Sequence, residues 1–445
     1  MKWREWVKRE SIKRFAHFIF INDVQHCCLY GHQGVMSVWE MWLPMPCSDA
    51  LWMAPTVQDW RRIMAEERKA RAGGNPPTLL DIVTAFVSPE AEMPVSTVAL
   101  DARTVPLDGL GLYAVIHGIF SVAWHYKHRK LPHYWANMMP NKLEDHQETE
   151  DDTRWLLTAL HAWKSRYNMF WQLAHYPLDY QPPSGMWSPP LRIAAAAIYD
   201  FACIWIQAPI NDIQVAAGSR FAHGRATSGH RAQLSWLRVN KALLSDDVCH
   251  HALNLVEAEL LYKNESTGQS GLHSYLMDPS YPLFLPFVAY VGGLALWAYA
   301  YNLDRQTAPG MQQQPLVSAD QSTYQVDSYG MAEYPRVNIS LPNSQQPFID
   351  SDDHTKIIRT LRGHLSLSPG NVDSPTLNNS QPVYYSKSPT MRENSPARLT
   401  LFKKGIDILL RHLRDQLNGH RWEIATESFE ILQGTTNGVN RGEYH

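Results

Sequence analysis

The sequence is poor in the features that mark secreted proteins. It holds five cysteines among 445 residues. An odd number at irregular spacing favours reduced thiols in a cytosolic or nuclear protein over a disulfide framework. The N-terminal segment is charged and has no continuous apolar stretch before a small-residue cleavage site, so it does not resemble a signal peptide. The five cysteines are Cys27, Cys28, Cys47, Cys203 and Cys249.

Motifs of nucleotide binding and of hydrolysis are missing as well. The sequence contains no Gly-x-Ser-x-Gly, no P-loop and no dinucleotide fingerprint. The 40 basic and 43 acidic residues nearly balance, with a formal net charge of −3. This balance argues against a strongly basic nucleic-acid surface. We therefore expect no catalytic residues and no segment that binds the phosphates of DNA.

Large aromatic residues and helical periodicity are what the sequence does have. It contains 16 tryptophans and 20 tyrosines, which bury much apolar area each and favour thick helical cores. In residues 2–31, apolar residues recur every three or four positions between lysines and arginines, which predicts an amphipathic packing helix. Glu5–Arg9 and Glu10–Arg14 are favourably oriented i,i+4 pairs, and Gly31 is expected to end the helix.

Further helices are predicted along most of the chain, and no sustained strand pattern appears. Ser48 or Asp49, Thr56 and Thr78 are expected to cap helices that begin after them. The fold class is therefore predicted to be all-α, an irregular multi-helix bundle with a long disordered insertion. The longer helical segments are expected at 79–87, 107–128, 155–175, 191–207, 228–263 and 281–301.

Residues 302–395 differ in composition from the rest. They are rich in Gln, Ser, Pro and Asn and contain too little apolar area to offset the entropy of ordering, so we predict a disordered insertion. One helical island is expected at 352–365, and a C-terminal helix pair at 396–435 is expected to return to the domain formed by 1–301. Four Ser-Pro steps are candidate phosphorylation sites, with chance occurrence equally open. They are Ser368, Ser374, Ser388 and Ser395.

Clusters of histidine and cysteine raise the question of a metal site. His26, Cys27 and Cys28 lie in the first predicted helix, with Cys47 further along. Adjacent cysteines do not readily share one tetrahedral zinc ion, so buried helical thiols are the preferred interpretation.

Two further clusters receive the same interpretation. His125, His128 and His133 fit a solvated helix end, where histidine suits the negative end of the helix dipole. Cys249-His250-His251 is likewise expected to be structural. We therefore predict no metal site and no cofactor in this chain.

Two local features could belong to another class of protein, a metal-dependent enzyme or a membrane protein. Glu150-Asp151-Asp152 precede an aromatic helix and resemble the magnesium-binding motif of terpene cyclases, but the second acidic motif is missing, so a solvated helix start is preferred. Residues 281–301 are long and uncharged enough for a membrane span. Pro282, Pro286 and the Gly292-Gly293 pair interrupt that run, so a buried helix is predicted.

Residues in several blocks follow an order that resembles a known family. The first block contains Trp3, Trp6, Glu10, Arg14, Phe15 and Asp23. The second contains Leu43, Pro44, Pro46, Cys47, Leu51, Trp52 and Trp60, and later positions are Asp212, Gln214, Gly218 and Trp297. This order resembles the fungal-specific transcription factor domain, in the branch attached to two-cysteine, two-histidine zinc fingers. The resemblance covers about 1–301 and 397–432.

The resemblance implies a regulatory domain of a transcription factor, located in the nucleus and acting on RNA polymerase II transcription. Its partners would be the transcription machinery or co-regulators, and it could form a homodimer. DNA would be contacted only through a zinc finger that is either on a separate polypeptide or missing from a truncated gene product. Only that finger would bind zinc, because no finger spacing occurs here. The chain is expected to start partway through the family's domain. The alternative hypothesis is an all-α enzyme or small-molecule binder with an aromatic-lined pocket.

Overall fold

A computed structural model describes most of the helical part of the chain. The described residues are 2–70, 74–87, 107–129, 153–173, 189–219, 221–222, 225–241, 244–261, 284–307, 354–365, 396–417 and 431. Within these ranges, helices joined by loops make up the structure, and the extended pairing consists of one hairpin of two-residue strands and an isolated bridge between Pro44 and Thr78. The prediction of an all-α fold is therefore confirmed. The chain forms two compact units, Met1–Ile206 and Gln207–His445.

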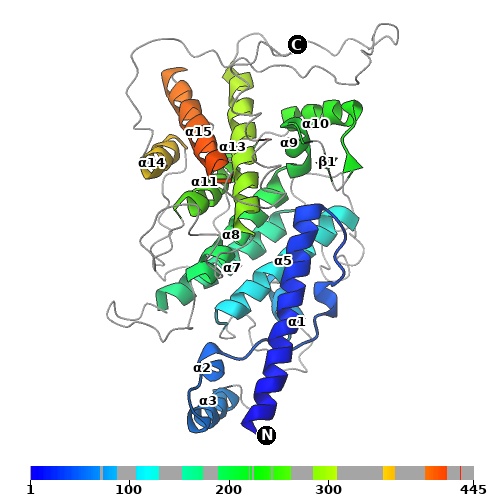
Figure 1. Ribbon diagram of the computed structural model, residues 1–445, viewed down its shortest axis with the longest axis vertical. Coiled ribbons are helices and arrows are strands. Elements are labelled where there is room, and N and C mark those ends of the chain that lie inside the picture. The colour runs from blue at the N-terminus through cyan, green and yellow to red at the C-terminus, as the bar shows by residue number, and fades with distance from the viewer. Residues whose placement is uncertain are drawn as a thin grey trace. The chain divides into compact units, whose positions relative to one another are not determined.

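The helices of Figure 1 follow the predicted periodic segments closely. In the first unit they are α1 (Trp3–Tyr30), η1 (Val38–Glu40), α2 (Asp49–Trp52), α3 (Val57–Ala70), α4 (Leu79–Val87), α5 (Gly109–Arg129), α7 (Arg154–Leu173) and α8 (Pro189–Gln207). The second unit contains α9 (Ile210–Ala216), β1 (Phe221–Ala222), β2 (Arg225–Ala226), α10 (Gly229–Lys241), α11 (Asp246–Leu261), α13 (Leu285–Thr307), α14 (His354–His364) and α15 (Pro396–Leu417).

Predicted capping residues start the short helices of the first unit. The hydroxyl of Thr78 accepts the N–H of Asp81 at 3.1 Å, while the Asp81 carboxylate accepts the Thr78 N–H at 2.8 Å. Thr56 caps α3 by accepting the N–H of Asp59 at 3.1 Å, and Ser48 caps α2. Each such cap satisfies an N–H that the helix itself leaves without a partner, and is worth about 1 kcal/mol.

Helix α1 ends where the sequence predicts, but its apolar residues do not all face the core. Gly31 takes a left-handed conformation (φ 64°) and donates its N–H to the carbonyl of Cys27. Phe20 and Val24 are buried, whereas Phe15 and Ile12 are mostly exposed. The expectation of a single packing stripe is therefore wrong for part of the helix, because apolar residues occur around its whole circumference.

Aromatic side chains fill the core of the first unit. Trp163 of α7 is fully buried, and its ring N–H donates to the carbonyl of Leu112 in α5 at 2.9 Å. Phe120 of α5 contacts the rings of Phe201 and Trp205 of α8 edge to face, at 5.5 and 5.2 Å between centroids. These geometries are the favourable ones for aromatic pairs, and they explain why the sequence contains so many large rings.

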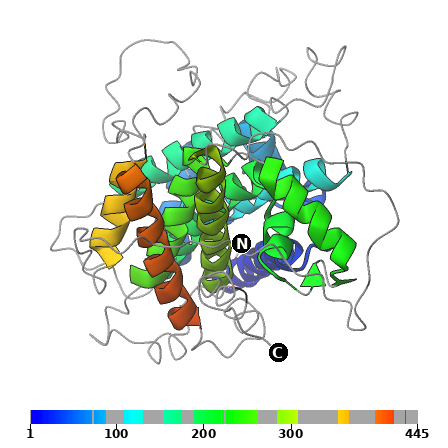
Figure 2. The same cartoon turned by 90° about the horizontal axis from the view of Figure 1, so that it is seen from above.

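In the second unit, α11 and α13 pack along each other, and α15 packs on both α13 and α14. Figure 2 shows α13, α15 and α14 side by side. A Cβ atom at Gly292 of α13 would lie 3.0 Å from the carbonyl oxygen of Ala252 and 3.0 Å from Cβ of Leu255. Glycine therefore allows the backbones of α11 and α13 to approach closely.

Several predicted boundaries need correction. Residues 228–263 form two helices, α10 and α11, because the segment between them starts a new helix at Ser245, which caps α11. Helix α13 continues to Thr307 instead of ending at 301. The helical island at 352–365 is present as α14. The rest of 302–395 lies outside the described residues, so its predicted disorder stays a prediction.

One histidine also lies elsewhere than expected. His125 is 7% exposed inside α5, so it does not sit at a solvated helix end. His128 fits that expectation better, although its ring stacks on Trp124 at 4.3 Å between centroids.

None of the described helices, α13 included, is long and apolar enough by itself to cross a bilayer. One bent pair of successive helices, α8 with α9, is long and apolar enough only when both are taken together.

We predict that Gly292→Ala lowers the stability of the second unit by about 1–3 kcal/mol, because the new methyl group forces α11 and α13 apart. Urea unfolding of the purified chain measures this change. Gly363→Ala is the matched control, since nothing lies within 4 Å of a Cβ at that position of α14. Equal effects of the two substitutions would contradict the close-approach argument.

Candidate functional site

Five of the family positions meet in one aromatic cluster at the N-terminal end of α1. Trp6 contacts the ring of Trp60 at 5.5 Å and that of Trp52 at 6.4 Å between centroids. Leu51 is buried among these rings, and Trp3 packs against the cluster. Figure 1 shows α2 and α3 beside this end of α1. The first and second sequence blocks are therefore brought together in space.

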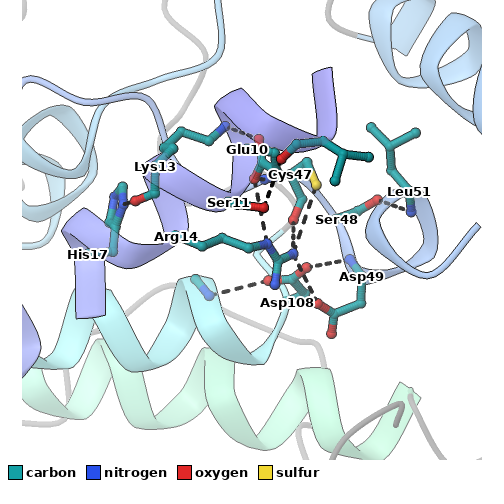
Figure 3. A network of polar contacts seen from close by, with 12 residues as sticks. Glu10, Ser11, Lys13, Arg14, His17, Cys47, Ser48, Asp49, Leu51 and Asp108 are labelled. Atoms are coloured by element: carbon teal, nitrogen blue, oxygen red, sulfur yellow. Dashed lines mark hydrogen bonds and ion pairs between the residues drawn. The ribbon is translucent and has the colours of Figure 1, made fainter. Parts of the chain in front are cut away.

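Beside this cluster, two side chains of α1 hold both peptide groups of Cys47 (Figure 3). The carboxylate of Glu10 accepts the N–H of Cys47 at 2.8 Å. Arg14, one helical turn later, donates from Nη2 to the carbonyl of Cys47 at 3.1 Å. Glu10 is only 4% exposed, and charge-assisted hydrogen bonds of this kind are stronger than neutral ones. We call Glu10, Arg14 and Cys47 the backbone clasp.

Further charges satisfy the two ions of the backbone clasp. Lys13 pairs with the carboxylate of Glu10 at 2.6 Å, and Nε of Arg14 lies 3.6 Å from the same carboxylate. The guanidinium of Arg14 also lies 3.5 Å from the carboxylate of Asp49 and stacks 4.5 Å from the ring centroid of Trp52. A buried carboxylate is tolerable only with such partners.

Asp108 connects this network to the start of α5. Its Oδ1 accepts the N–H of Gly111 at 3.2 Å, which makes it the N-cap of that helix. Its Oδ2 accepts the N–H of Asp49 at 2.7 Å. One carboxylate therefore fixes both the first turn of α2 and the first turn of α5.

The proline-rich segment before Cys47 is tied to α4. The N–H of Met45 donates to the carbonyl of Pro77 at 2.9 Å, and the N–H of Leu79 donates to that of Leu43 at 3.3 Å. Pro44 has no N–H, so these bonds lie on the residues on either side of it. The segment 43–49 is thus held between α1, α4 and the start of α5.

Burial changes the acidity of three groups in the network. Burial and, to a smaller extent, the nearby carboxylate of Asp49 together raise the pKa of Asp108 to about 7. Burial also raises the pKa of Asp49, against the lowering effect of Arg14. For the Cys47 thiol, burial raises the pKa, and so does the charge of Glu10. A thiol with a raised pKa stays protonated and is a poor nucleophile, so the arrangement supports packing and not covalent chemistry.

The histidine and cysteine clusters do not form a metal site within the described part of the chain. There, no group of three or more His, Cys, Asp or Glu side chains is placed to hold a metal ion. Cys27 is buried, and Cys47 belongs to the backbone clasp. Cys249 and His251 are buried on α11.

Two other positions of the first block lie outside the network. The Asp23 carboxylate accepts the N–H of Met36 at 2.8 Å, which holds the chain as it leaves α1. Phe15 is 62% exposed and takes no part in the core.

The remaining family positions belong to the second unit and have local roles. Asp212 accepts a hydrogen bond from the hydroxyl of Ser235 at 2.8 Å, which joins α9 to α10. The carbonyl of Gln214 accepts the N–H of Ser219, and Gly218 between them has a φ of 106° that favours glycine. Trp297 of α13 contacts the ring of Trp236 at 5.9 Å between centroids.

Several sequence-predicted sites lie outside the described residues. They are the acidic run 150–152, His133, and the four candidate phosphorylation sites Ser368, Ser374, Ser388 and Ser395. Each of these stays a prediction.

Sequence reasoning missed Asp108. The predicted helix begins at 107, and an aspartate directly before an apolar helical run is a capping signal that could have identified it. Sequence reasoning also missed the contacts that Gln25 of α1 makes with α5. The side-chain amide of Gln25 donates to the hydroxyl of Tyr113 at 2.8 Å and lies 3.0 Å from Nε2 of His117. No local pattern marks that contact.

Comparison with known proteins agrees with the resemblance found in the sequence. Residues 1–165 match the fungal specific transcription factor domain. Zinc finger protein klf1 of Schizosaccharomyces pombe is 26% identical over 307 residues, which cover 68% of this chain and 34% of klf1. No solved structure matches the chain.

Two further relatives have related printed names. Zinc finger protein zas1 of Schizosaccharomyces pombe is 23% identical over 68% of this chain and 30% of its own length. The nicotinate catabolism cluster-specific transcription factor of Emericella nidulans is 22% identical over 67% of this chain and 31% of its own length. The matched region thus spans about a third of the length of each of these relatives.

We predict that Arg14→Lys destabilises the first unit by about 1.5–3 kcal/mol, because lysine cannot keep the bond to Cys47 and the contacts to Asp49 and Trp52 together. Arg62→Lys on α3 is the control. Arg62 is 59% exposed and pairs with Glu66 at the surface, so its loss changes stability by less than about 0.5 kcal/mol. Urea unfolding of both variants measures the difference.

We predict that Asp108→Asn changes the pH dependence of stability. The folded pKa of about 7 lies above the value of about 3.9 in an unfolded chain, so the folded state binds a proton that the unfolded state releases. The stabilisation is present below pH 4 and is lost as the pH rises through 7. From pH 5 to pH 8, the free energy of unfolding of the wild type should fall by about 2–3 kcal/mol relative to the variant.

Urea titrations at several pH values measure this difference. Asp415→Asn, at a side chain 61% exposed, is the control and should show no such trend. A constant difference between wild type and Asp108→Asn across this range would contradict the burial argument.

Proposed function

Since residues 1–165 match the fungal-specific transcription factor domain, we propose that this chain is the regulatory region of a zinc-finger transcription factor that controls RNA polymerase II transcription through protein contacts. The family consists of transcription factors and not of enzymes, so the alternative of an all-α enzyme is set aside. The match to this family, with similarity to zinc finger proteins over two thirds of the chain, is the observation that carries the proposal.

The structure supports a role in which the chain acts by holding surfaces in place. The backbone clasp and the tryptophan cluster consist of interior contacts that position α1, α2 and α5. The Cys47 thiol at their centre is kept protonated by burial and by the charge of Glu10. Such a network gives rigidity, which a domain needs when it presents the same surface to protein partners.

DNA recognition is proposed to rest on a zinc finger outside this chain. With a net charge of −3, the chain lacks the excess of Lys and Arg that phosphate binding requires. Partners of the domain are then the transcription machinery or co-regulators, and its place of action is the nucleus. The zinc ion belongs to the finger, because a finger holds its ion with its own cysteines and histidines.

We predict that the chain, fused to an unrelated DNA-binding domain, changes the output of a reporter gene that carries the matching site. Arg14→Met in the fusion should abolish the change at equal protein level, because it opens the backbone clasp. Arg62→Lys should leave the change intact. A folded, expressed fusion without effect on the reporter would contradict the regulatory role.

A second experiment measures DNA binding by the chain alone, without the fused DNA-binding domain. We expect no sequence-selective binding when the chain is tested against a random oligonucleotide pool. Selective binding at nanomolar concentration would contradict the proposed division of labour with a separate finger.

A further inference from the structure

Helix α1 has an apolar surface that the other described residues of the first unit leave exposed. Ile12 is 61% exposed, Phe15 62%, Phe18 58% and Ile19 43%. At 100° per residue these four side chains lie on one side of α1, opposite the buried Glu10, His17 and Val24. We call Ile12, Phe15, Phe18 and Ile19 the outer face of α1.

The size of the outer face exceeds what single exposed residues produce. Large side chains at this exposure contribute on the order of 100 Å² each, so the four together present about 400 Å² of contiguous apolar surface. A patch of about 400 Å² is comparable to the largest apolar patch of a typical monomer, which often serves in binding. Singly scattered exposed residues, such as Met169 of α7 at 52%, need no such explanation.

The spacing of the outer face is that of a helix that pairs with another helix. Lys8, Ile12, Phe15, Ile19 and Asn22 follow steps of four, three, four and three residues. This is the step pattern of the seam in a two-helix coiled coil. Helix α1 is 28 residues long. The seam from Lys8 to Asn22 spans about four of its turns and can form knobs-into-holes contacts along its apolar centre.

The charges on α1 indicate which helix fits. Lys8 and Arg9 lie before the apolar centre, and Asp23 lies after it. A second α1 running in the opposite direction would place the basic end of one copy beside Asp23 of the other. A parallel copy would instead set Lys8 against Lys8, which repels. The outer face is therefore complementary to itself in the antiparallel direction, as a two-fold interface requires.

We propose that two copies of this chain associate through the outer face of α1, with the two helices antiparallel. Phe15 and Ile19 of one copy pack against Ile19 and Phe15 of the other, near the two-fold axis. The helix dipole adds to the pairing, because the basic N-terminal end of each α1 lies along the C-terminal half of its partner.

The area predicts a modest affinity. With the polar residues at both ends included, each copy buries on the order of 500 Å², which is below the roughly 800 Å² per partner of a standard stable interface. We therefore expect association in the micromolar range. This proposal does not depend on the regulatory function proposed above.

Sedimentation velocity of the full chain between about 1 and 100 µM tests the proposal. The wild type should shift from monomer to dimer with concentration. Phe15→Asp should raise the dissociation constant at least about tenfold, because it places two carboxylates at the centre of the interface. Its circular dichroism and thermal midpoint should not change, since Phe15 makes no core contact in the monomer.

Met169→Asp is the matched control, with the same change at an exposed residue on another helix, and it should leave the dimer intact. A wild type that stays monomeric at the highest concentration would overturn the proposal and assign the outer face to a different protein. Equal weakening of the dimer by Phe15→Asp and Met169→Asp would overturn it too.

The direction of the helices needs its own measurement. A photo-reactive amino acid at position 8, in a mixture of isotopically heavy and light chains, reports contacts between copies only. Crosslinks to residues 19–26 of the other copy are expected. Crosslinks to residues 4–12 of the other copy would overturn the antiparallel arrangement.

Discussion

The first unit depends on two hydrogen bonds at Cys47: its N–H donates to the carboxylate of Glu10, and its carbonyl accepts from the guanidinium of Arg14. They fix a loop that cannot form a regular element of its own, because it contains two prolines. Helix α2 begins at the end of this fixed loop, and its Trp52 contacts the ring of Trp6. The N–H of Asp49 can then donate to the carboxylate of Asp108 at the start of α5. Loss of either ion would leave the other with only Lys13 or Asp49 as its charged partner and would break one of the two bonds to Cys47.

The two sides of helix α1 have different roles. Its inner side supplies the ions of the backbone clasp and the buried Phe20 and Val24. Its outer face is apolar and exposed, on a helix that the core holds in place. A rigid helix loses little conformational freedom when it binds a partner. In the regulatory role proposed above, this rigidity would link the interior packing of α1 to recognition at its surface.

The sequence predicts the helices well and the site only in part. Caps at Ser48, Thr56 and Thr78 and the end of α1 at Gly31 are local effects, so neighbouring residues suffice to predict them. The family resemblance singles out Trp6, Trp52 and Trp60, but neither it nor the periodicity predicts that the three rings meet in one cluster. Which apolar residues of α1 face solvent could not be predicted, because the helix is apolar on all sides and the choice depends on contacts far along the chain. The same holds for Asp108, whose partner Asp49 lies in a distant segment.

The backbone clasp binds the peptide groups of Cys47 and not its side chain, which affects how the sequence of the domain can change. The N–H and the carbonyl at position 47 are common to every residue except proline, which lacks the N–H. Mutations can therefore replace the cysteine by another small residue and leave both hydrogen bonds in place. The constraint on the sequence falls on Glu10 and Arg14, whose ionic groups have no equivalent in other side chains of the same length. Related domains can thus share this architecture although few of their residues are identical.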